Sequence, residues 1–340
     1  LCAVLAEYNR ILQVVHEFYD IDLTIGRIDQ LAELSLTHKI TTTLSPLFIN
    51  RGDFEGVDRV IARIVEQNAA GARVWPQVQT RPIDISFCFA VPSLLFIRLR
   101  GWYRVMRFGT PATIMAAFQD ETQRQQLVQE ATSMMPLWST LILRQVQTEA
   151  NQQYVGKTLA EIAELRGTDA LNAMIDLSLE ESLDAHFISA DMGHNDDDKV
   201  GSMLRHPHVM IGASDGGAHI LSFSTYGDTG YLLGHFVRDK QLLSMEEAIK
   251  KITSDTADIW AIPDRGLLKS GYIADITIFD ANTIDRGPEY YVQDVPGDGH
   301  RYVRDAIGVE KVIIGGAVAY DHLQGYSDEH RGQVIGAPQR

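Results

Sequence analysis

The sequence lacks the features that mark several common classes of protein. It has only two cysteines in 340 residues, Cys2 and Cys88, and no Cys-x-x-Cys pair. A disulfide framework and a cysteine zinc ribbon are therefore not expected. Positive charge is also scarce, since 30 Lys and Arg stand against 45 Asp and Glu, giving a net charge of −15. Such a surface repels phosphate backbones and anionic lipid, so neither nucleic acid nor a membrane is an expected partner.

Long apolar runs and nucleotide-binding motifs are missing as well. The most apolar stretch covers residues 87–97, which is too short to span a bilayer. The first residues have no initiator Met and no basic segment, and they do not resemble a signal peptide. The low cysteine content fits a reducing cytoplasm, and a cytoplasmic location is expected. The sequence contains no GxGxxG, no GxxxxGK and no HExxH, which argues against nucleotide binding and zincin chemistry.

What is present favours a parallel α/β fold. Helices and β-branched strands alternate along much of the chain, as in βαβ units. The patterns predict helices that include residues 3–18, 27–36, 53–68 and 197–204, and barrel-type strands at 39–44, 72–78, 186–189 and 209–213. A closed (β/α)₈ barrel needs eight strands, and only four are found.

We therefore predict a TIM-type barrel that lacks its N-terminal strands, followed by a small β-sandwich. The expected boundaries are residues 1–263 for the barrel part, 264–322 for the sandwich and 323–340 for a polar tail. A half barrel leaves open sheet edges. The protein is therefore expected to form a homo-oligomer or to pair with a missing N-terminal half.

The clearest candidate for chemistry follows the strand at 209–213. There Ser214, Asp215, two glycines and His219 come where a parallel strand reaches the mouth of a barrel. A carboxylate at that place can bind a metal or move protons. The alternative is an Asx turn, because Asp before Gly-Gly is common at strand ends.

Other polar side chains also follow predicted strands. His194 and Asn195 come after the strand at 186–189, and both are candidate substrate-binding residues, whereas the acids at 196–198 are better explained as helix caps. Gln77 and Arg81 lie at the end of the strand at 72–78. Arg81 is a candidate partner for a substrate carboxylate, or else a loop-capping residue.

Residues 87–109 form an aromatic and Arg-rich insertion in this pattern. Its six aromatic side chains suit an acyl pocket, a lid or a subunit contact equally well. They are Phe87, Phe89, Phe96, Trp102, Tyr103 and Phe108. Cys88, which lies among them, is expected to be buried rather than reactive.

Three blocks together resemble the amidohydrolase superfamily. Residues 204–219 are similar to its last barrel strand, residues 264–280 resemble its return into a β-sandwich, and residues 312–318 resemble its final strand pair. More narrowly, the first block resembles the N-acyl-D-amino-acid deacylase, or D-aminoacylase-like, branch. The resemblance covers about residues 30 to 320.

The resemblance implies a metal-dependent hydrolase, with zinc the usual metal. The substrate would be a small-molecule amide similar to an N-acyl amino acid. Asp215 would be a metal ligand and would carry the proton of the attacking water to the leaving amine. His219 would touch the substrate. The remaining metal ligands are expected upstream of this chain.

Several family positions differ here. No His-x-His pair follows a first strand, the branch's cysteine ligand is absent, and Thr41–Ser45 stands where many members carry histidines. Residues 225–229 replace an arginine that binds the substrate carboxylate. Two alternatives therefore stay open. The protein could cleave another amide, a cyclic amide or an ester, or it could be a non-catalytic subunit without a complete metal site.

Overall fold

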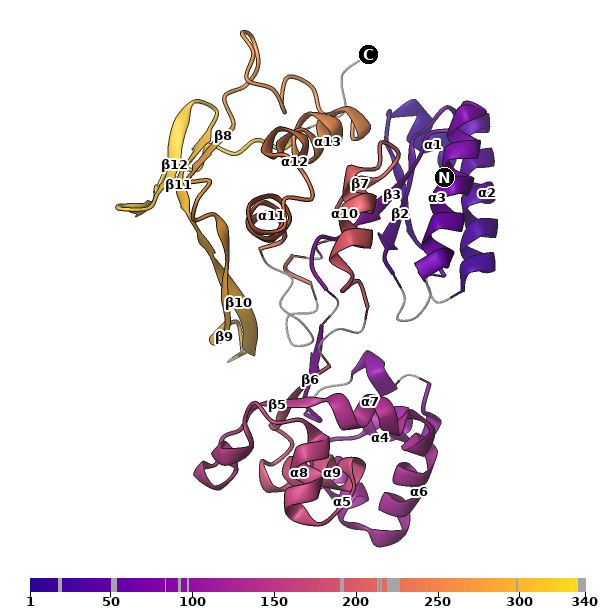
Figure 1. The fold of residues 1–340 in the computed structure, drawn as a ribbon, viewed down its shortest axis with the longest axis vertical. Helices are drawn as coiled ribbons and strands as arrows, with labels where there is room; N and C mark the ends of the chain where they lie inside the picture. Colours follow the sequence, from indigo (N-terminus) through magenta and orange to yellow (C-terminus); the bar gives the residue numbers. More distant parts are fainter. Residues whose placement is uncertain are drawn as a thin grey trace.

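A computed structural model of the chain describes residues 1–17, 20–49, 54–82, 84–90, 93–96, 98–189, 193–212, 214, 216–218, 227–297 and 299–335. Figure 1 shows three parts: a parallel sheet with its helices, a mostly helical lobe, and an antiparallel β-rich part toward the C-terminus. Within the described residues, no helix has both the length and the apolar character needed to cross a membrane.

The N-terminal part is a parallel sheet with the strand order β1-β2-β3-β7. Its strands are β1 (Leu12–Val15), β2 (Thr42–Leu47), β3 (Val74–Val78) and β7 (Met210–Ile211). Helices α2 (Ile21–His38) and α3 (Phe54–Ala69) connect the first three strands, and α10 (Asp197–Arg205) precedes β7. Leu44, Val74 and Val78 are fully buried, as expected for parallel strands covered by helices. The βαβ pattern predicted for this region is confirmed.

The helix predicted over residues 3–18 is correct only for its first residues. A short helix, α1 (Cys2–Glu7), ends before Asn9, whose φ is +50°. Strand β1 follows and pairs in parallel with β2, from Leu12 opposite Thr42 to Val15 opposite Ser45. Short apolar runs do not distinguish a helix from a strand by periodicity alone, and here the hydrogen bonds of the neighbouring strand decide.

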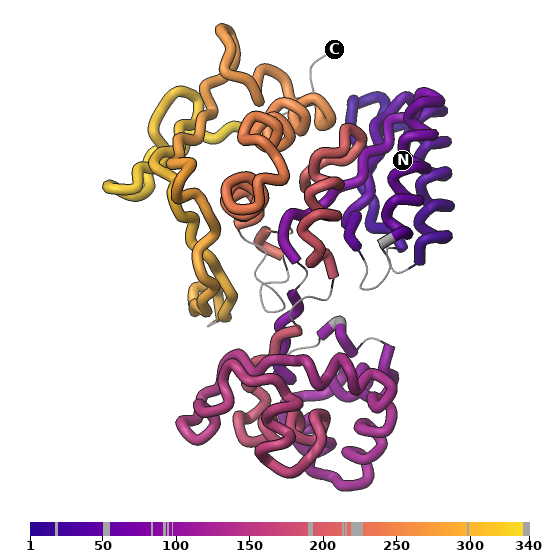
Figure 2. Tube along the Cα trace, viewed as in Figure 1, coloured from indigo at the N-terminus to yellow at the C-terminus, as the bar shows by residue number. Residues whose placement is uncertain are grey.

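The lobe interrupts the parallel sheet. The chain leaves after β3, forms the lobe from residues 84–189, which we call the insert, and returns before β7 (Figure 2). Its sheet has the order β4-β6-β5, with β4 (Ile85–Phe87), β5 (Ile142–Gln145) and β6 (His186–Ser189). Both pairings of β6 are antiparallel. The prediction that 186–189 is a barrel-type strand is therefore wrong, because strand propensity does not indicate which strand will be the partner.

The insert has a hydrophobic core of its own, separate from the core of the parallel sheet. Phe96 stacks on Trp138, with ring centroids 5.2 Å apart and 10° between the ring planes. Phe87, Phe89 and Trp102 are also fully buried. These aromatic side chains pack against one another, whereas Phe108 is 77% exposed. The surrounding helices are α4 (Arg100–Phe108), α5 (Pro111–Gln119), α6 (Glu121–Ala131), α7 (Met135–Thr140), α8 (Leu159–Arg166) and α9 (Ala170–Glu180).

The C-terminal part begins with helices and ends in antiparallel strands. Helix α11 (Asp228–Tyr231) continues into a π-helical segment (Leu232–Asp239), followed by α12 (Met245–Ile252) and α13 (Ser254–Ile259). One sheet has the order β13-β12-β11-β8, from β13 (Gly325–Tyr326), β12 (Ala317–Asp321), β11 (Val309–Ile314) and β8 (Ile276–Phe279). The other is a hairpin of β9 (Asp285–Val295) and β10 (Gly299–Ile307).

The architecture is thus mixed α/β. The described strands include a four-stranded parallel sheet and, toward the C-terminus, two antiparallel sheets. A TIM-type barrel that lacks its N-terminal strands, a small β-sandwich and the domain boundaries at 263/264 and 322/323 stay predictions.

Candidate functional site

Polar side chains gather beyond the carboxyl ends of the parallel strands. His16 follows β1, Gln77 and Arg81 lie at the end of β3 and beyond it, and His194 comes from the segment before α10. We call these four residues the sheet-edge site. In α/β folds this edge is where substrates bind.

His194 is held by two backbone groups. Its Nδ1 accepts a hydrogen bond from Ile49 N–H at 3.3 Å. The proton therefore lies on Nε2, which donates to the carbonyl of Gln79 at 2.7 Å. The side chain is 2% exposed, and its burial lowers the pKa to about 4. His194 is thus a neutral imidazole that joins the loops after β2 and β3.

Arg81 is buried beside a carboxylate. The Arg81 Nε lies 2.8 Å from Oδ1 of Asp228, and both side chains are at most 10% exposed. An Arg81 Nη donates to the carbonyl of Ser214 at 3.3 Å. The Thr80 hydroxyl donates to the Asp228 carbonyl at 2.9 Å. The contact with Arg81 holds Ser214, the residue directly before Asp215, close to the end of β3.

The other predicted side chains have separate environments. Gln77 is buried, and its Nε2 donates to the hydroxyl of Thr43 at 3.0 Å. Asn195 is exposed. Asp196 caps α10 by accepting a hydrogen bond from Lys199 N–H at 2.9 Å, which confirms the predicted cap. Thus Gln77, Arg81 and His194 lie along one edge of the sheet.

Asp215 and His219 lie outside the described residues. Their predicted roles as proton shuttle, metal ligand and substrate contact therefore stay predictions. Ser214, which precedes Asp215, is described and is held by Arg81.

His16 does not emerge from the sequence, because the pattern of residues 3–18 predicts a helix there. It is 5% exposed, and burial lowers its pKa against the opposing effect of a backbone hydrogen bond with Ser45. Leu12 and Val14 are partly buried whereas Gln13 and Val15 are exposed, but the residue types do not alternate in this way, so no local sequence signal places His16 at a strand end.

The sheet-edge site does not by itself provide a metal-ligand set among the described residues. Both ring nitrogens of His194 are occupied, and Gln77 and Arg81 are poor ligands for zinc. His16 could supply at most one ligand. In the described part of the chain, the one close group of three potential ligands is Cys88, Asp184 and His186, in the insert. We call these three residues the insert site. The sequence pattern places Cys88 only in the core and His186 only in a strand.

Comparison with known proteins identifies relatives. A model of the amidohydrolase family matches residues 110–320. N-acyl-D-glutamate deacylase of Alcaligenes xylosoxydans xylosoxydans is 30% identical over 193 residues, which are 54% of this chain and 36% of that protein. D-aminoacylase of the same organism is 30% identical over 182 residues, or 53% of this chain and 34% of that protein. The matched region thus spans about a third of these curated relatives.

Solved structures show the same fold. N-acyl-D-glutamate deacylase from Bordetella bronchiseptica, complexed with zinc and a phosphonate inhibitor, aligns with a TM-score of 0.60 at 20% identity. That alignment covers 99% of this chain and 58% of the other. A D-aminoacylase structure described for its binuclear metal centre aligns with a TM-score of 0.59 at 19% identity, covering 98% of this chain and 58% of the other.

Proposed function

Since the chain belongs to the amidohydrolase family, we propose that the protein hydrolyses the amide bond of a small molecule similar to an N-acyl amino acid. The observation that carries this proposal is the homology to two deacylases, each 30% identical over about half of this chain. The polar side chains at the carboxyl edge of a parallel sheet support it, because such an edge can hold a substrate.

In this proposal Asp215 is the proton shuttle. It takes a proton from the attacking water and passes it to the leaving amine. His219 and Asn195 would contact the substrate, together with Gln77. Arg81 and His194 have protein partners for their polar groups. Arg81 and His194 would position the loops around Asp215 and would not contact the substrate themselves.

A divalent metal, with zinc as the first candidate, is part of the proposed activity because one structural relative is complexed with zinc. The described sheet-edge residues do not supply three ligands for it. Asp215 and residues other than the described ones would have to provide its ligands.

The test is hydrolysis of N-acetyl-D-glutamate, N-acetyl-L-glutamate, a cyclic amide and an ester by the purified chain. We expect cleavage of an N-acyl amino acid, and a loss of about 10² to 10⁴ in kcat/KM for Asp215→Asn, the range for a lost general acid–base. Asp255→Asn is the matched control and should keep full activity, because Asp255 on α13 pairs with Lys250 on α12. Equal rates for wild type and Asp215→Asn would contradict the proposal. Preference for the cyclic amide or the ester would redirect it to those substrates.

The second candidate function is that of a non-catalytic amidohydrolase-like subunit. It is favoured by the incomplete ligand set among the described sheet-edge residues. The same assay separates the two candidates, because a subunit of this kind would hydrolyse none of the substrates.

A partner is also part of the proposal. In the described strands, β1 and β7 are the two edges of the parallel sheet, and Val15 on β1 is 73% exposed. Open parallel edges favour pairing, which supports a homo-oligomer or association with an N-terminal half. Light scattering that shows a monodisperse monomer would contradict this. The cytoplasmic location stays a prediction.

A further inference from the structure

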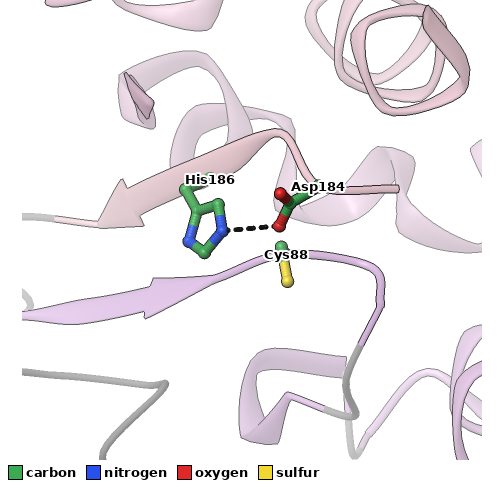
Figure 3. A group of neighbouring side chains, drawn as sticks. All are labelled: Cys88, Asp184 and His186. Atoms are coloured by element: carbon green, nitrogen blue, oxygen red, sulfur yellow. Dashed lines mark hydrogen bonds and ion pairs between the residues drawn. The ribbon is translucent and has the colours of Figure 1, made fainter. Parts of the chain in front are cut away.

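The geometry points to a metal site in the insert, formed by Cys88, Asp184 and His186 and suited to Zn²⁺. Each residue offers one ligand atom, and all three atoms lie within 4.8 Å of one another. Figure 3 shows the three side chains gathered beside the start of β6. The sheet-edge site shares no residue with this group.

Strand register explains how these residues come together. Strands β4 and β6 are antiparallel, with Ile85 opposite Ser189 and Phe87 opposite Phe187. Continuing that register by one residue places Cys88 opposite His186. The hydrogen bond from Ala90 N–H to the Leu183 carbonyl, at 3.2 Å, shows that the pairing extends past the strand ends. Asp184 is two residues before His186, so the two side chains share one face of the strand.

Hydrogen bonds orient two of the three ligands. His186 Nε2 lies 2.9 Å from Asp184 Oδ1. The other oxygen of Asp184 accepts a hydrogen bond from Gln147 Nε2 at 2.8 Å. His186 Nδ1 lies 2.7 Å from the hydroxyl of Tyr302 on β10. Metal-bound histidines commonly use a second partner of this kind to fix the ring.

The protons of His186 and its partners can rearrange so that a metal ion takes the place of the proton on Nε2. Without metal, Nε2–H donates to Asp184 while Nδ1 accepts from Tyr302. With a cation bound at Nε2, the imidazole proton moves to Nδ1 and is donated to the Tyr302 oxygen, which can accept it. The Cys88 thiol gives up its proton to become a thiolate, so binding releases one proton to solvent.

The set of ligand atoms selects the kind of ion. A thiolate, an imidazole and a carboxylate suit Zn²⁺ or Co²⁺, whereas Mg²⁺ and Ca²⁺ prefer oxygen. Zinc lies about 2.3 Å from sulfur and about 2.0–2.1 Å from nitrogen, so its ligand atoms stand roughly 3.3–3.7 Å apart. The present separations, from 2.9 Å up to 4.8 Å at most, bracket that range.

A nucleophilic cysteine is a weaker explanation of the same cluster. A catalytic histidine must accept the thiol proton at one nitrogen while an acid holds the other. Here the two nitrogens of His186 are engaged by Asp184 and Tyr302.

The three ligands differ in their exposure to solvent. Cys88 is 6% exposed and His186 is 1% exposed, whereas the Asp184 side chain is 42% exposed. The nearby Arg144 guanidinium, 4.2 Å from the centre of the Tyr302 ring, is paired with Glu289. Its charge is therefore compensated. A metal here would tie the insert, through His186 and Tyr302, to the β9–β10 hairpin.

Cobalt spectroscopy on the full chain tests the site. The protein is stripped with a chelator and titrated with Co²⁺ without oxygen. We expect one equivalent to produce a near-ultraviolet thiolate-to-cobalt band, which is lost in Cys88→Ser. Cys2→Ser is the matched control, because Cys2 is the other cysteine of the chain, and it should keep the band. Asp215→Asn should also keep it, which separates this site from the proposed catalytic one.

A second set of variants guards against misfolding. His186→Gln and Asp184→Asn both keep the Cys88 thiol. We expect each variant to bind Zn²⁺ at least tenfold more weakly than wild type, measured by competition with a chromophoric chelator. Their far-ultraviolet circular dichroism should be unchanged, which shows that they fold. A wild-type protein without the thiolate band would overturn the inference. So would a Cys88→Ser protein that keeps the band, or a His186→Gln protein with wild-type zinc affinity.

Discussion

The sheet-edge site and the insert site each contain a buried histidine, but the two histidines have different kinds of partner. At the sheet edge, His194 is bonded to backbone groups of Ile49 and Gln79. In the insert, His186 is bonded to the side chains of Asp184 and Tyr302. A backbone amide only donates and a backbone carbonyl only accepts, whereas a carboxylate and a phenol can adapt to a new proton position. The first histidine is therefore structural, and the second can take a metal.

The largest expected effect concerns the sheet edge. Arg81→Ala leaves Asp228 buried without its cation, and breaking a buried pair in this way costs about 3–5 kcal/mol of unfolding free energy. Arg59→Ala is the matched control, because Arg59 pairs with Asp22 where both side chains are mostly exposed, and its loss should cost about 1 kcal/mol or less. Urea denaturation measures both. Equal losses would show that the Arg81–Asp228 pair does not hold this edge together.

The second prediction uses pH. Burial lowers the pKa of His194 to about 4 in the folded protein, from the value of 6.5 that is ordinary for a histidine. The unfolded chain therefore takes up the proton first as pH falls. Neutral His194 therefore contributes about 3 kcal/mol to the free energy of unfolding. This contribution is complete above about pH 6.5 and is lost as the pH falls toward 4.

The measurement compares wild type with His194→Gln in urea at several pH values between about 7.5 and 4.5, a range that covers most of this titration. The variant should be less stable at the upper end, and the difference between the two proteins should shrink as the pH falls. A difference that stays constant across this range would mean that His194 is not held neutral by burial.

The smallest expected effect concerns the insert site. Tyr302→Phe removes the hydroxyl next to His186 Nδ1 but keeps the buried ring. Loss of such a partner weakens metal binding by about tenfold to hundredfold. Tyr290→Phe is the control, because its hydroxyl bonds to exposed Asp305. Competition titration with Zn²⁺ measures both, and equal affinities would remove Tyr302 from the site.

In the parallel part of the fold, a helix or strand can be predicted from the sequence where its own residue pattern matches the structure that it forms in the sheet. The apolar face of α3 and the β-branched run of β2 both indicate their structures from a few residues. Strand β1 is not predictable in the same way, because four residues with an apolar pattern acquire their identity from the neighbouring β2. The same ambiguity hides His16.

The two sites differ in the same respect. Gln77 and Arg81 can be found from the sequence because they lie near the end of β3, and the ends of parallel strands meet at one edge. His194 reaches this edge for a different reason than the one predicted, because the strand before it, β6, is antiparallel and its hydrogen bonds to Ile49 and Gln79 hold it there. The cap at Asp196 can be found because it lies directly before α10. The insert site escapes such reasoning because it depends on the register between β4 and β6, and no local pattern indicates that Cys88 will face His186.

X-ray absorption at the zinc edge tests most directly whether the ligand set lies in the insert rather than at the sheet edge. The chain is loaded with one equivalent of Zn²⁺, and the nearest shell of atoms around the metal is measured. We expect one sulfur at about 2.3 Å together with nitrogen or oxygen at about 2.0–2.2 Å. A shell of nitrogen and oxygen without sulfur would contradict it and would move the metal away from Cys88.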